Sequence, residues 1–435
     1  MASPKRSQRL PAVGWQGGHG GVPVERKLNL GVIGLGARAA SLLGVFRRVY
    51  RGLRVAAVAD PEEDGVRRRL RDAEVSERDT AFFPGADELL RHAGDLDALM
   101  IGTRCNIHTP IAVKAAPTGL PLYLEKPVAI TYEQVLALRD AYRGREKSVV
   151  VSFPLRVTPL FQKVMEVVES DRLGVVNQVQ SVNNVPYGGV YYARETYRNF
   201  DVTGGMWLQK ATHDFDYLNA LLGTPTAVSA VMNRMAYGGD MPHDLRCSAC
   251  DLADTCLESP ASVARRGDDG GVGLDDHLCV FGNGIKLQDA GAALVAYDDG
   301  THASYTQNFL SRRSAASRGA TITGYKATLS FDWYRGTVTV VDHHRDHVDS
   351  FNVKATSGHL GGDEALARNF IDMCLGRDES RTDLASGLLS AAMCLAARES
   401  AHALRWTPVG DVYSESFPDR DLPITPTPAN VEPPS

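Results

Sequence analysis

The chain has 435 residues, of which 43% are hydrophobic, and its formal net charge is −5. This length predicts two domains or three. The mild negative charge argues against a nucleic-acid-binding surface, and no apolar run reaches the ~20 residues of a membrane-spanning helix.

Both ends of the sequence have the composition of tails. Residues 1–27 and 411–435 are rich in glycine or proline, so we expect a disordered tail and an extended tail. The first has basic residues but lacks the apolar stretch of a secretory signal. Seven cysteines, an odd number, without such a signal favour a reducing compartment. We therefore expect a cytoplasmic protein.

The first predicted elements are a strand, a glycine-rich turn, a helix and a second strand. The two strands, Leu28–Ile33 and Leu53–Ala59, are apolar runs rich in β-branched residues, as in parallel strands that are buried on both faces. The turn Gly34–Ala39 has the pattern G-x-G-x-x-A. This pattern, between a strand and a helix, is typical of a dinucleotide-binding unit.

The turn has the residue types that a pyrophosphate requires. Gly34 permits a tight turn, Gly36 lets the phosphates approach the backbone, and the helix N-terminus offers free N–H groups. Asp60, after the second strand, would accept hydrogen bonds from the ribose hydroxyls and repel a 2′-phosphate, which favours NAD. Arg38 could bind such a phosphate, so NADP stays possible. The expected cofactor-binding residues of this unit are Gly34, Leu35, Gly36, Ala37, Arg38 and Asp60.

Strands and helices continue to alternate up to residue 150. This order predicts a doubly wound parallel sheet, that is, a Rossmann domain over residues 28–150. Ligands bind to such sheets at the carboxyl ends of the strands, where Asp60, Thr103 and Lys126 fall.

The pattern changes after Phe153 to one long helix and then to period-two strands. Glycine- and aspartate-rich turns join these strands, which predicts an α+β domain over residues 151–410 with an open, largely antiparallel sheet. Residues 236–287 form a cysteine-rich insertion with little periodicity. A connection of this length is usually functional or needs a staple of its own.

The cysteines of the insertion suggest such a staple. Cys247 and Cys250 form a C-x2-C step, which directs two thiolates towards one point, as in half of a tetrahedral zinc site. A structural zinc would supply folding energy that the insertion lacks. The alternative is a surface loop with reduced cysteines. The expected ligands are Cys247, Cys250, Cys256 and Cys279, with His243 or His277 as alternatives for the fourth.

Two short segments carry the residues expected to perform chemistry. Glu125-Lys126-Pro127 ends a buried strand, and the proline cannot extend the ladder, so Lys126 is held at the mouth of the crevice. In the second domain, residues 204–216 predict a helix opened by two glycines, with Gln209 and His213 on one face. Lys210 and Asp214 beside them are interpreted mainly as a surface i,i+4 pair.

Taken together, these motifs resemble the glucose–fructose oxidoreductase / inositol dehydrogenase / MocA (Gfo/Idh/MocA) family. The resemblance covers Leu28 to about Trp406, and the motifs are specific only in combination. They are Gly34–Ala39, Val58–Asp60, Thr103–His108, Glu125–Pro127, Arg156–Pro159, Gly204–His213 and Gly361–Asp363.

The resemblance implies a fold and an activity. The family has a Rossmann domain and a C-terminal domain whose open sheet often forms oligomers, so a homodimer or homotetramer is expected. Its usual reaction is hydride transfer between NAD(P) and a secondary alcohol or ketone of a sugar, cyclitol or related polyol. By resemblance Lys126 contacts both the cofactor and the reacting hydroxyl, and His213 accepts the proton. The further expected cofactor contacts are Thr103, His108 and Glu125, and the expected substrate contacts are Arg156, Trp207 and Lys210.

The sequence departs from the family at two positions. Family members commonly have Asp where this chain has Gln209, and an amide cannot take a proton at neutral pH. The role of base therefore falls on His213, Lys126 stabilises the developing alkoxide, and Gln209 orients the substrate or the imidazole. Cys105 stands where the family usually has Asn, so one cofactor contact there is expected to differ.

Two other functions are compatible with these residues. One is an NAD-dependent glycoside hydrolase that oxidises its substrate transiently and gives no net NADH. The other is a non-catalytic nucleotide-sensing regulator, which would be expected to have lost Lys126 or His213. Both residues are present.

Overall fold

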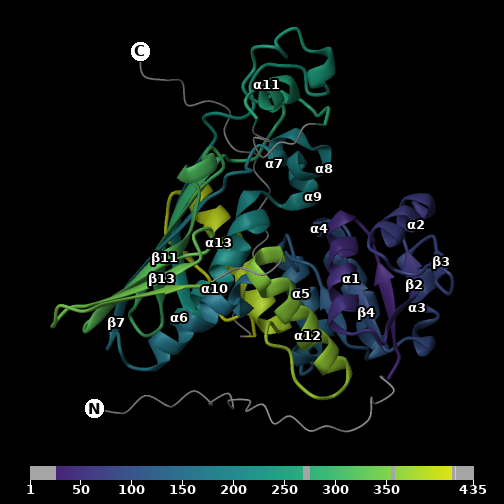
Figure 1. Cartoon of the computed structure of the whole chain (residues 1–435), viewed down its shortest axis with the longest axis horizontal. Coiled ribbons are helices and arrows are strands. Elements are labelled where there is room, and N and C mark those ends of the chain that lie inside the picture. Colours follow the sequence, from purple (N-terminus) through teal and green to yellow (C-terminus); the bar gives the residue numbers. More distant parts are fainter. Residues whose placement is uncertain (1–25, 268–274, 354–357, 414–416, 418–435) are drawn as a thin grey trace.

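The computed structural model describes residues 26–267, 275–353, 358–413 and 417 (Figure 1). The two expected tails lie almost wholly outside these residues. Among the described residues, no helix combines the length and the apolar character that crossing a membrane requires.

The first half of the chain forms a six-stranded parallel sheet in the order β3-β2-β1-β4-β5-β6. The chain order reverses between β1 and β4, so the carboxyl ends of these strands flank the crevice where ligands bind to such sheets. The edge strand β3 has only three residues, too few to show a periodicity in the sequence. The strands are β1 (Leu28–Ile33), β2 (Leu53–Ala59), β3 (Ala81–Phe83), β4 (Ala98–Ile101), β5 (Leu122–Leu124) and β6 (Val149–Val151).

Helices cover both faces of this sheet. Helix α4 begins at Cys105 and includes Pro110. The helices are α1 (Ala37–Val49), α2 (Glu63–Asp72), α3 (Ala86–Leu90), α4 (Cys105–Ala115) and α5 (Tyr132–Ala141).

The second half is built on a nine-stranded sheet in the order β14-β13-β12-β11-β7-β10-β9-β8-β15. Its neighbours are antiparallel except for β7 and β10, which run parallel. The predicted open, largely antiparallel sheet is therefore confirmed. The strands are β7 (Val176–Asn184), β8 (Pro225–Asn233), β9 (Ala290–Tyr297), β10 (His302–Asn308), β11 (Ser317–Gly324), β12 (Ala327–Asp332), β13 (Thr337–Asp342), β14 (Val348–Asn352) and β15 (Thr407–Pro408).

One face of this sheet is covered by helices that also contact the first sheet's domain, as Figure 1 shows. The other face carries exposed apolar side chains, among them Val231 and Leu294. The helices are α6 (Pro159–Glu169), α7 (Val190–Ala193), α8 (Glu195–Arg198), α9 (Phe200–Thr203), α10 (Thr212–Leu222), α11 (Pro260–Arg265), α12 (Gly362–Cys374) and α13 (Leu384–Ala403).

Helix α12 packs against the Rossmann domain although it comes from the end of the chain. Phe370 is fully buried, stacks on Phe46 with ring centroids 5.5 Å apart, and meets Tyr123 edge-on at 5.5 Å. Leu366 and Ile371 join the same core. The apolar core of the cofactor-binding half therefore includes residues far beyond position 150.

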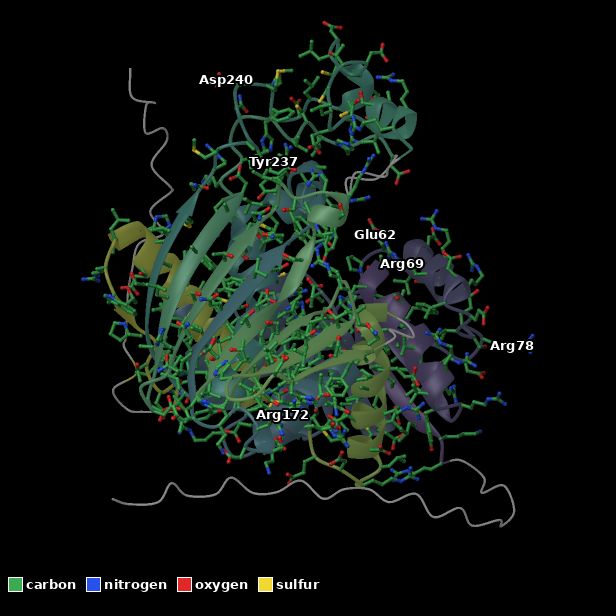
Figure 2. All side chains as sticks on the ribbon, turned by 60° about the vertical axis from the view of Figure 1, so that its left-hand side comes forward. Glu62, Arg69, Arg78, Arg172, Tyr237 and Asp240 are labelled. Atoms are coloured by element: carbon green, nitrogen blue, oxygen red, sulfur yellow. The ribbon has the colours of Figure 1, made fainter. Side chains whose placement is uncertain are left out.

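The insertion packs into an apolar core that it shares with the main domain. Val263, Val280 and Ile285 are buried together with Tyr192 and Tyr237, whose rings stack with centroids 4.1 Å apart. The insertion lies at one end of the nine-stranded sheet, where Tyr237 and Asp240 are labelled in Figure 2, and Arg172 is at the opposite end.

Candidate active site

The glycine-rich turn borders a cavity of about 450 Å³ at the carboxyl ends of the parallel strands. Gly34 has φ +79°, and a side chain there would collide with Thr103. Gly36 has open space where a Cβ would project, and no side chain caps the first N–H groups of α1. Glycine, free N–H groups and a cavity of this size fit the pyrophosphate and adenosine of a dinucleotide.

Asp60 lines the same cavity and is held in place by backbone groups. Its two carboxylate oxygens accept hydrogen bonds from Leu35 N at 3.0 Å and from Glu62 N at 3.0 Å. The guanidinium of Arg69 lies nearby and donates to Leu35 O at 3.0 Å. Glu62 and Arg69 are labelled at the outer end of this unit in Figure 2. A ribose in the cavity would therefore lie between a carboxylate and an arginine.

Arg38 does not lie beside Asp60 but forms a clamp with the C-terminal half. Its two terminal nitrogens donate to the carboxylate of Asp363 at 2.8 and 2.6 Å, and its Nε lies 3.6 Å from Glu125. Burial would raise the pKa of Asp363, but the hydrogen bonds from Arg38 and His359 hold it well below its usual range. The charge of Arg38 is therefore already balanced by acids of this chain.

Lys126 is partly buried at the end of β5 and reaches across to the second domain. Its Nζ donates to the backbone carbonyl of Gln209 at 2.9 Å. Burial, together with the nearby charge of Lys210 and against opposing effects of Cys105 and Glu125, lowers the pKa of Lys126 to about 8. This lysine can change its protonation state near neutral pH, as acid–base groups of active sites do.

Gln209 lies in a π-helical turn, Trp207–Ala211, that leads into α10. Such turns occur often at functional sites, because they bring side chains to positions that an α-helix would separate. The side-chain amide of Gln209 donates to Cys105 Sγ at 3.0 Å. The two positions at which the sequence departs from the family pattern are therefore in contact with each other.

His213 is buried at the start of α10, close to the same residues. Its Nδ1 has no hydrogen-bond partner among the described residues, and Phe153 meets its ring edge-on. The ring of His359 is 6.4 Å away. Burial, followed by the charge of Lys126, holds the pKa of His213 well below its ordinary value. The imidazole is therefore neutral at pH 7 and has a free nitrogen.

Lys210 and Asp214 are not the predicted surface pair, and that prediction is wrong. Both side chains are buried, with 5% and 0% of their surface exposed. Lys210 Nζ donates to Tyr187 Oη at 2.8 Å, whereas Asp214 accepts from Arg318 Nε at 2.9 Å and from Tyr305 at 2.9 Å. The two residues belong to separate networks because the π-helical turn changes their relative positions.

Three other predicted site residues have structural contacts. The buried His108 lies between the carbonyls of Thr103 and Pro127, at 3.0 and 2.9 Å, and does not line the cavity. Trp207 is 1% exposed and stacks on Phe215 in the core. Arg156 Nε lies 3.3 Å from the buried carboxylate of Asp216. These three residues pack around the site, and none of them lines the cavity.

The predicted zinc site finds no support. Among the described residues, no three His, Cys, Asp or Glu side chains are grouped so that they could hold a metal ion. Burial, followed by the nearby Cys256, Cys279 and Cys250, raises the pKa of the Cys247 thiol to about 12. Val263, Val280 and Ile285 of the insertion are instead buried in a core that they share with residues of the main domain, which contributes folding energy without a metal.

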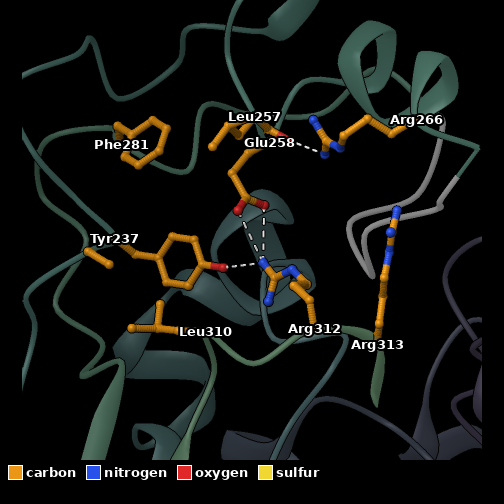
Figure 3. A pocket seen from close by; sticks show the side chains of 9 residues that line it. Tyr237, Leu257, Glu258, Arg266, Phe281, Leu310, Arg312 and Arg313 are labelled. Carbon is orange, nitrogen blue, oxygen red and sulfur yellow. Dashed lines mark hydrogen bonds and ion pairs between the residues drawn. The ribbon is translucent and has the colours of Figure 1, made fainter. Parts of the chain in front are cut away.

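A further pocket of about 480 Å³ lies where the insertion meets the loop after β10 (Figure 3). Arg312 at its floor donates to Tyr237 Oη at 2.6 Å and to the carboxylate of Glu258 at 3.1 and 3.3 Å. Arg266 donates to the carbonyl of Leu257 at 2.6 Å. The bonds of Arg312 connect the insertion to the sheet domain, whereas that of Arg266 lies within the insertion.

Comparison with known proteins agrees with this architecture. Residues 28–153 match the model of an oxidoreductase family with an NAD-binding Rossmann fold, and residues 161–330 match the GFO/IDH/MocA C-terminal domain. The chain is therefore an NAD-binding oxidoreductase. It belongs to the Gfo/Idh/MocA family, as its motifs suggest.

Individual relatives are distant. The putative oxidoreductase YteT of Bacillus subtilis (strain 168) is 26% identical over 72% of this chain and 80% of that protein. Inositol 2-dehydrogenase 2 of Saccharopolyspora erythraea is 29% identical over 36% of this chain and 45% of the enzyme. A structure of levoglucosan dehydrogenase with NADH and levoglucosan superimposes with a TM-score of 0.71 and 16% identity, over 88% of this chain and 100% of that chain. At this identity the likeness shows the fold.

Proposed function

We propose that this enzyme transfers hydride between NAD and a secondary alcohol or ketone of a sugar, cyclitol or related polyol. The proposal rests mainly on the position of Lys126, which comes from the cofactor domain. Its Nζ donates to the backbone carbonyl of Gln209 at 2.9 Å, and its charge acts on the neighbouring His213. The names of the relatives, an inositol dehydrogenase and a levoglucosan dehydrogenase, support the substrate class.

Each of these residues has one role in the proposed reaction. NAD held at the glycine-rich turn would supply the acceptor for the hydride of the carbinol carbon. His213 is neutral and has a free nitrogen, so it accepts the hydroxyl proton. The ammonium of Lys126 stabilises the negative charge that develops on the oxygen as the hydride leaves. Gln209, fixed by its bond to Cys105, orients the imidazole or the substrate.

The preferred cofactor in this proposal is NAD. Asp60 is held at the cavity by Leu35 N and Glu62 N, where its carboxylate would oppose a 2′-phosphate. Arg38 is occupied by Asp363, which argues against its use for that phosphate. Arg69 and Arg104 also line the cavity, and a cation there would favour NADP.

The test is a panel of sugars, cyclitols and polyols with NAD, in which formation of NADH is followed by absorbance. Once a substrate is found, His213→Ala should lower turnover by about 10²–10⁴ while NAD affinity stays within a few-fold. A variant that keeps near-normal turnover would exclude His213 as the base. Conversion of a glycoside without net NADH would favour the hydrolase alternative.

We also propose that the open face of the nine-stranded sheet joins copies of this chain into a homodimer or homotetramer. Its exposed apolar side chains on β8, β9, β13 and β14 support this proposal; they are Val231, Leu294, Val341 and Val348. Light scattering should give two or four chains per particle, and Leu294→Asp should reduce that number. A monomeric wild-type protein would contradict it.

A further inference from the structure

The buried ammonium of Lys210 has few partners in the described part of the chain. Lys210 is 5% exposed, and Tyr187 Oη at 2.8 Å is the hydrogen-bond acceptor that the described residues give it. An ammonium has three N–H donors, so two remain. A buried charge is stable only where it is paired, and the described residues place no carboxylate within ion-pair distance of Lys210.

The acidic side chains near Lys210 interact with other residues. Both oxygens of Asp214 accept hydrogen bonds from the network of Arg318, Asn183 and Tyr305. Glu125 lies beside Arg38. The sequence also has the neutral Gln209 where relatives commonly have Asp, so this part of the site has lost one negative charge.

A second ammonium, that of Lys126, lies close to Lys210. The charge of Lys210 is close enough to lower the pKa of both Lys126 and His213. The nicotinamide of NAD is cationic and cannot balance these charges, and the phosphates of NAD belong at the glycine-rich turn. A negative group is therefore missing from the substrate side of the site.

We propose that Lys210 and Tyr187 form an anion-binding subsite and that the substrate is an acidic sugar or polyol with a carboxylate. This inference rests on the proposed function and specifies its substrate class. The two free donors of Lys210 match the two oxygens of a carboxylate, and the hydroxyl of Tyr187 can donate to one of them. The reacting hydroxyl then lies at Lys126 and His213.

The aromatic neighbours of Lys210 do not replace this anion. Its Nζ lies 4.7 Å from the ring centroid of Tyr187 and 5.6 Å from that of Tyr191. Such contacts compensate only part of the cost of burying a charge, and they leave the N–H donors unused. The two rings instead provide apolar faces for the carbon skeleton of a sugar.

The experiment uses the full-length enzyme and matched pairs of compounds that differ in their acidic group. These are glucuronate with glucose, galacturonate with galactose, and gluconate with sorbitol; glucose 6-phosphate separates phosphate from carboxylate. Formation of NADH gives kcat/KM for each. Calorimetric titration of the NADH-bound enzyme with glucuronate measures binding without turnover. The variants are Lys210→Met, Lys210→Arg and Tyr187→Phe, and Lys326→Met, at an exposed lysine, is the control for loss of a charge.

The wild-type enzyme should prefer the acidic member of a pair by at least about tenfold in kcat/KM, since a site built to pair a charge rejects the analogue that lacks it. Lys210→Met should lower this ratio at least about tenfold, mainly through KM for the acid, and abolish glucuronate binding. Lys210→Arg should keep the preference, and Tyr187→Phe should weaken it. NADH binding by each variant verifies that it is folded.

The subsite would be overturned, while the proposed function stands, if the wild-type enzyme preferred the neutral members. The same holds if Lys210→Met lowered kcat/KM equally for the acidic and the neutral member of a pair. Preference for glucose 6-phosphate alone would overturn the carboxylate assignment. Glucuronate binding that depends on Lys210, without NADH from any compound, would support the subsite and refute the proposed function. If Lys210→Met does not fold, the wild-type preference and Tyr187→Phe decide.

Discussion

Replacement of Lys126 by methionine should make the protein more stable at pH 7 and nearly inactive. The pKa of Lys126 is lowered from 10.5 to about 8, chiefly by burial. At 1.36 kcal/mol per pKa unit, the folded protein bears a cost of about 3 kcal/mol for holding this lysine charged. Methionine has a similar length and no charge, so it removes that cost.

The variant also loses a hydrogen bond, which reduces the gain. The carbonyl of Gln209 accepts from Lys126 Nζ at 2.9 Å, and a bond from a charged donor contributes about 1.5–3 kcal/mol. The net stabilisation at pH 7 should therefore be about 1 kcal/mol. Turnover should fall by about 10²–10⁴ because the alkoxide loses its cation. Stability and activity thus oppose each other at this residue.

The difference in unfolding free energy between Lys126→Met and wild type should depend on pH. Because the folded pKa is about 8 and the unfolded value is 10.5, the cost of the charge is complete below pH 8 and disappears as pH rises to 10.5. The difference in unfolding free energy between Lys126→Met and wild type should therefore shrink and reverse between pH 7 and pH 10. Urea unfolding at several pH values measures it, with Lys326→Met as the control. A gain that does not change with pH, or a loss already at pH 7, would refute the reasoning.

Three further predictions concern the same site. kcat/KM for oxidation should fall above about pH 8 as Lys126 loses its proton, and an acid limb near pH 6.5 would show that the pKa of His213 is not lowered by burial. Asp60→Asn should reduce the preference for NAD over NADP by about tenfold in a fluorescence titration, because the repulsion between the carboxylate and the 2′-phosphate is lost. Tighter binding of NADP than of NAD by the wild-type protein would mean that Asp60 is misassigned. Arg38→Ala should lower the unfolding free energy by about 2–3 kcal/mol at pH 7, less than for a fully buried pair because Arg38 is 34% exposed on its side chain. Since the pKa of Asp363 is held low, that deficit should shrink as pH falls below 4, and a deficit that stays constant would exclude the ion pair as its cause.

The sequence predicts those features of the fold that depend on local pattern. The parallel strands and the glycine-rich turn are visible because apolar runs and glycine spacing lie within a few residues of each other. Helix α12 shows the limit of this approach. Its amphipathic pattern predicts a helix, but nothing in the pattern indicates that Phe370 stacks on Phe46 in the other half of the chain.

The same limit applies to the site. Lys126 and His213 could be chosen from motifs, whereas Tyr187 gives no sequence signal because its partner Lys210 comes from a different element. His359, which contacts Asp363 at 3.0 Å, belongs to none of the motifs, so the sequence does not indicate it either. The zinc prediction used cysteine spacing, but convergence of thiolates depends on how the insertion folds, and spacing alone does not determine this.

The position of α12 has a consequence for how the protein is made. The strands and helices of the cofactor-binding half leave the ribosome first, yet Phe46 and Tyr123 remain uncovered until the chain has been made past Cys374. During that interval the nascent Rossmann half presents an apolar surface, and Arg38 lacks its partner Asp363. Premature termination anywhere in the nine-stranded sheet therefore yields a fragment with an open core, which is a substrate for chaperones and proteases and not a small nucleotide-binding protein.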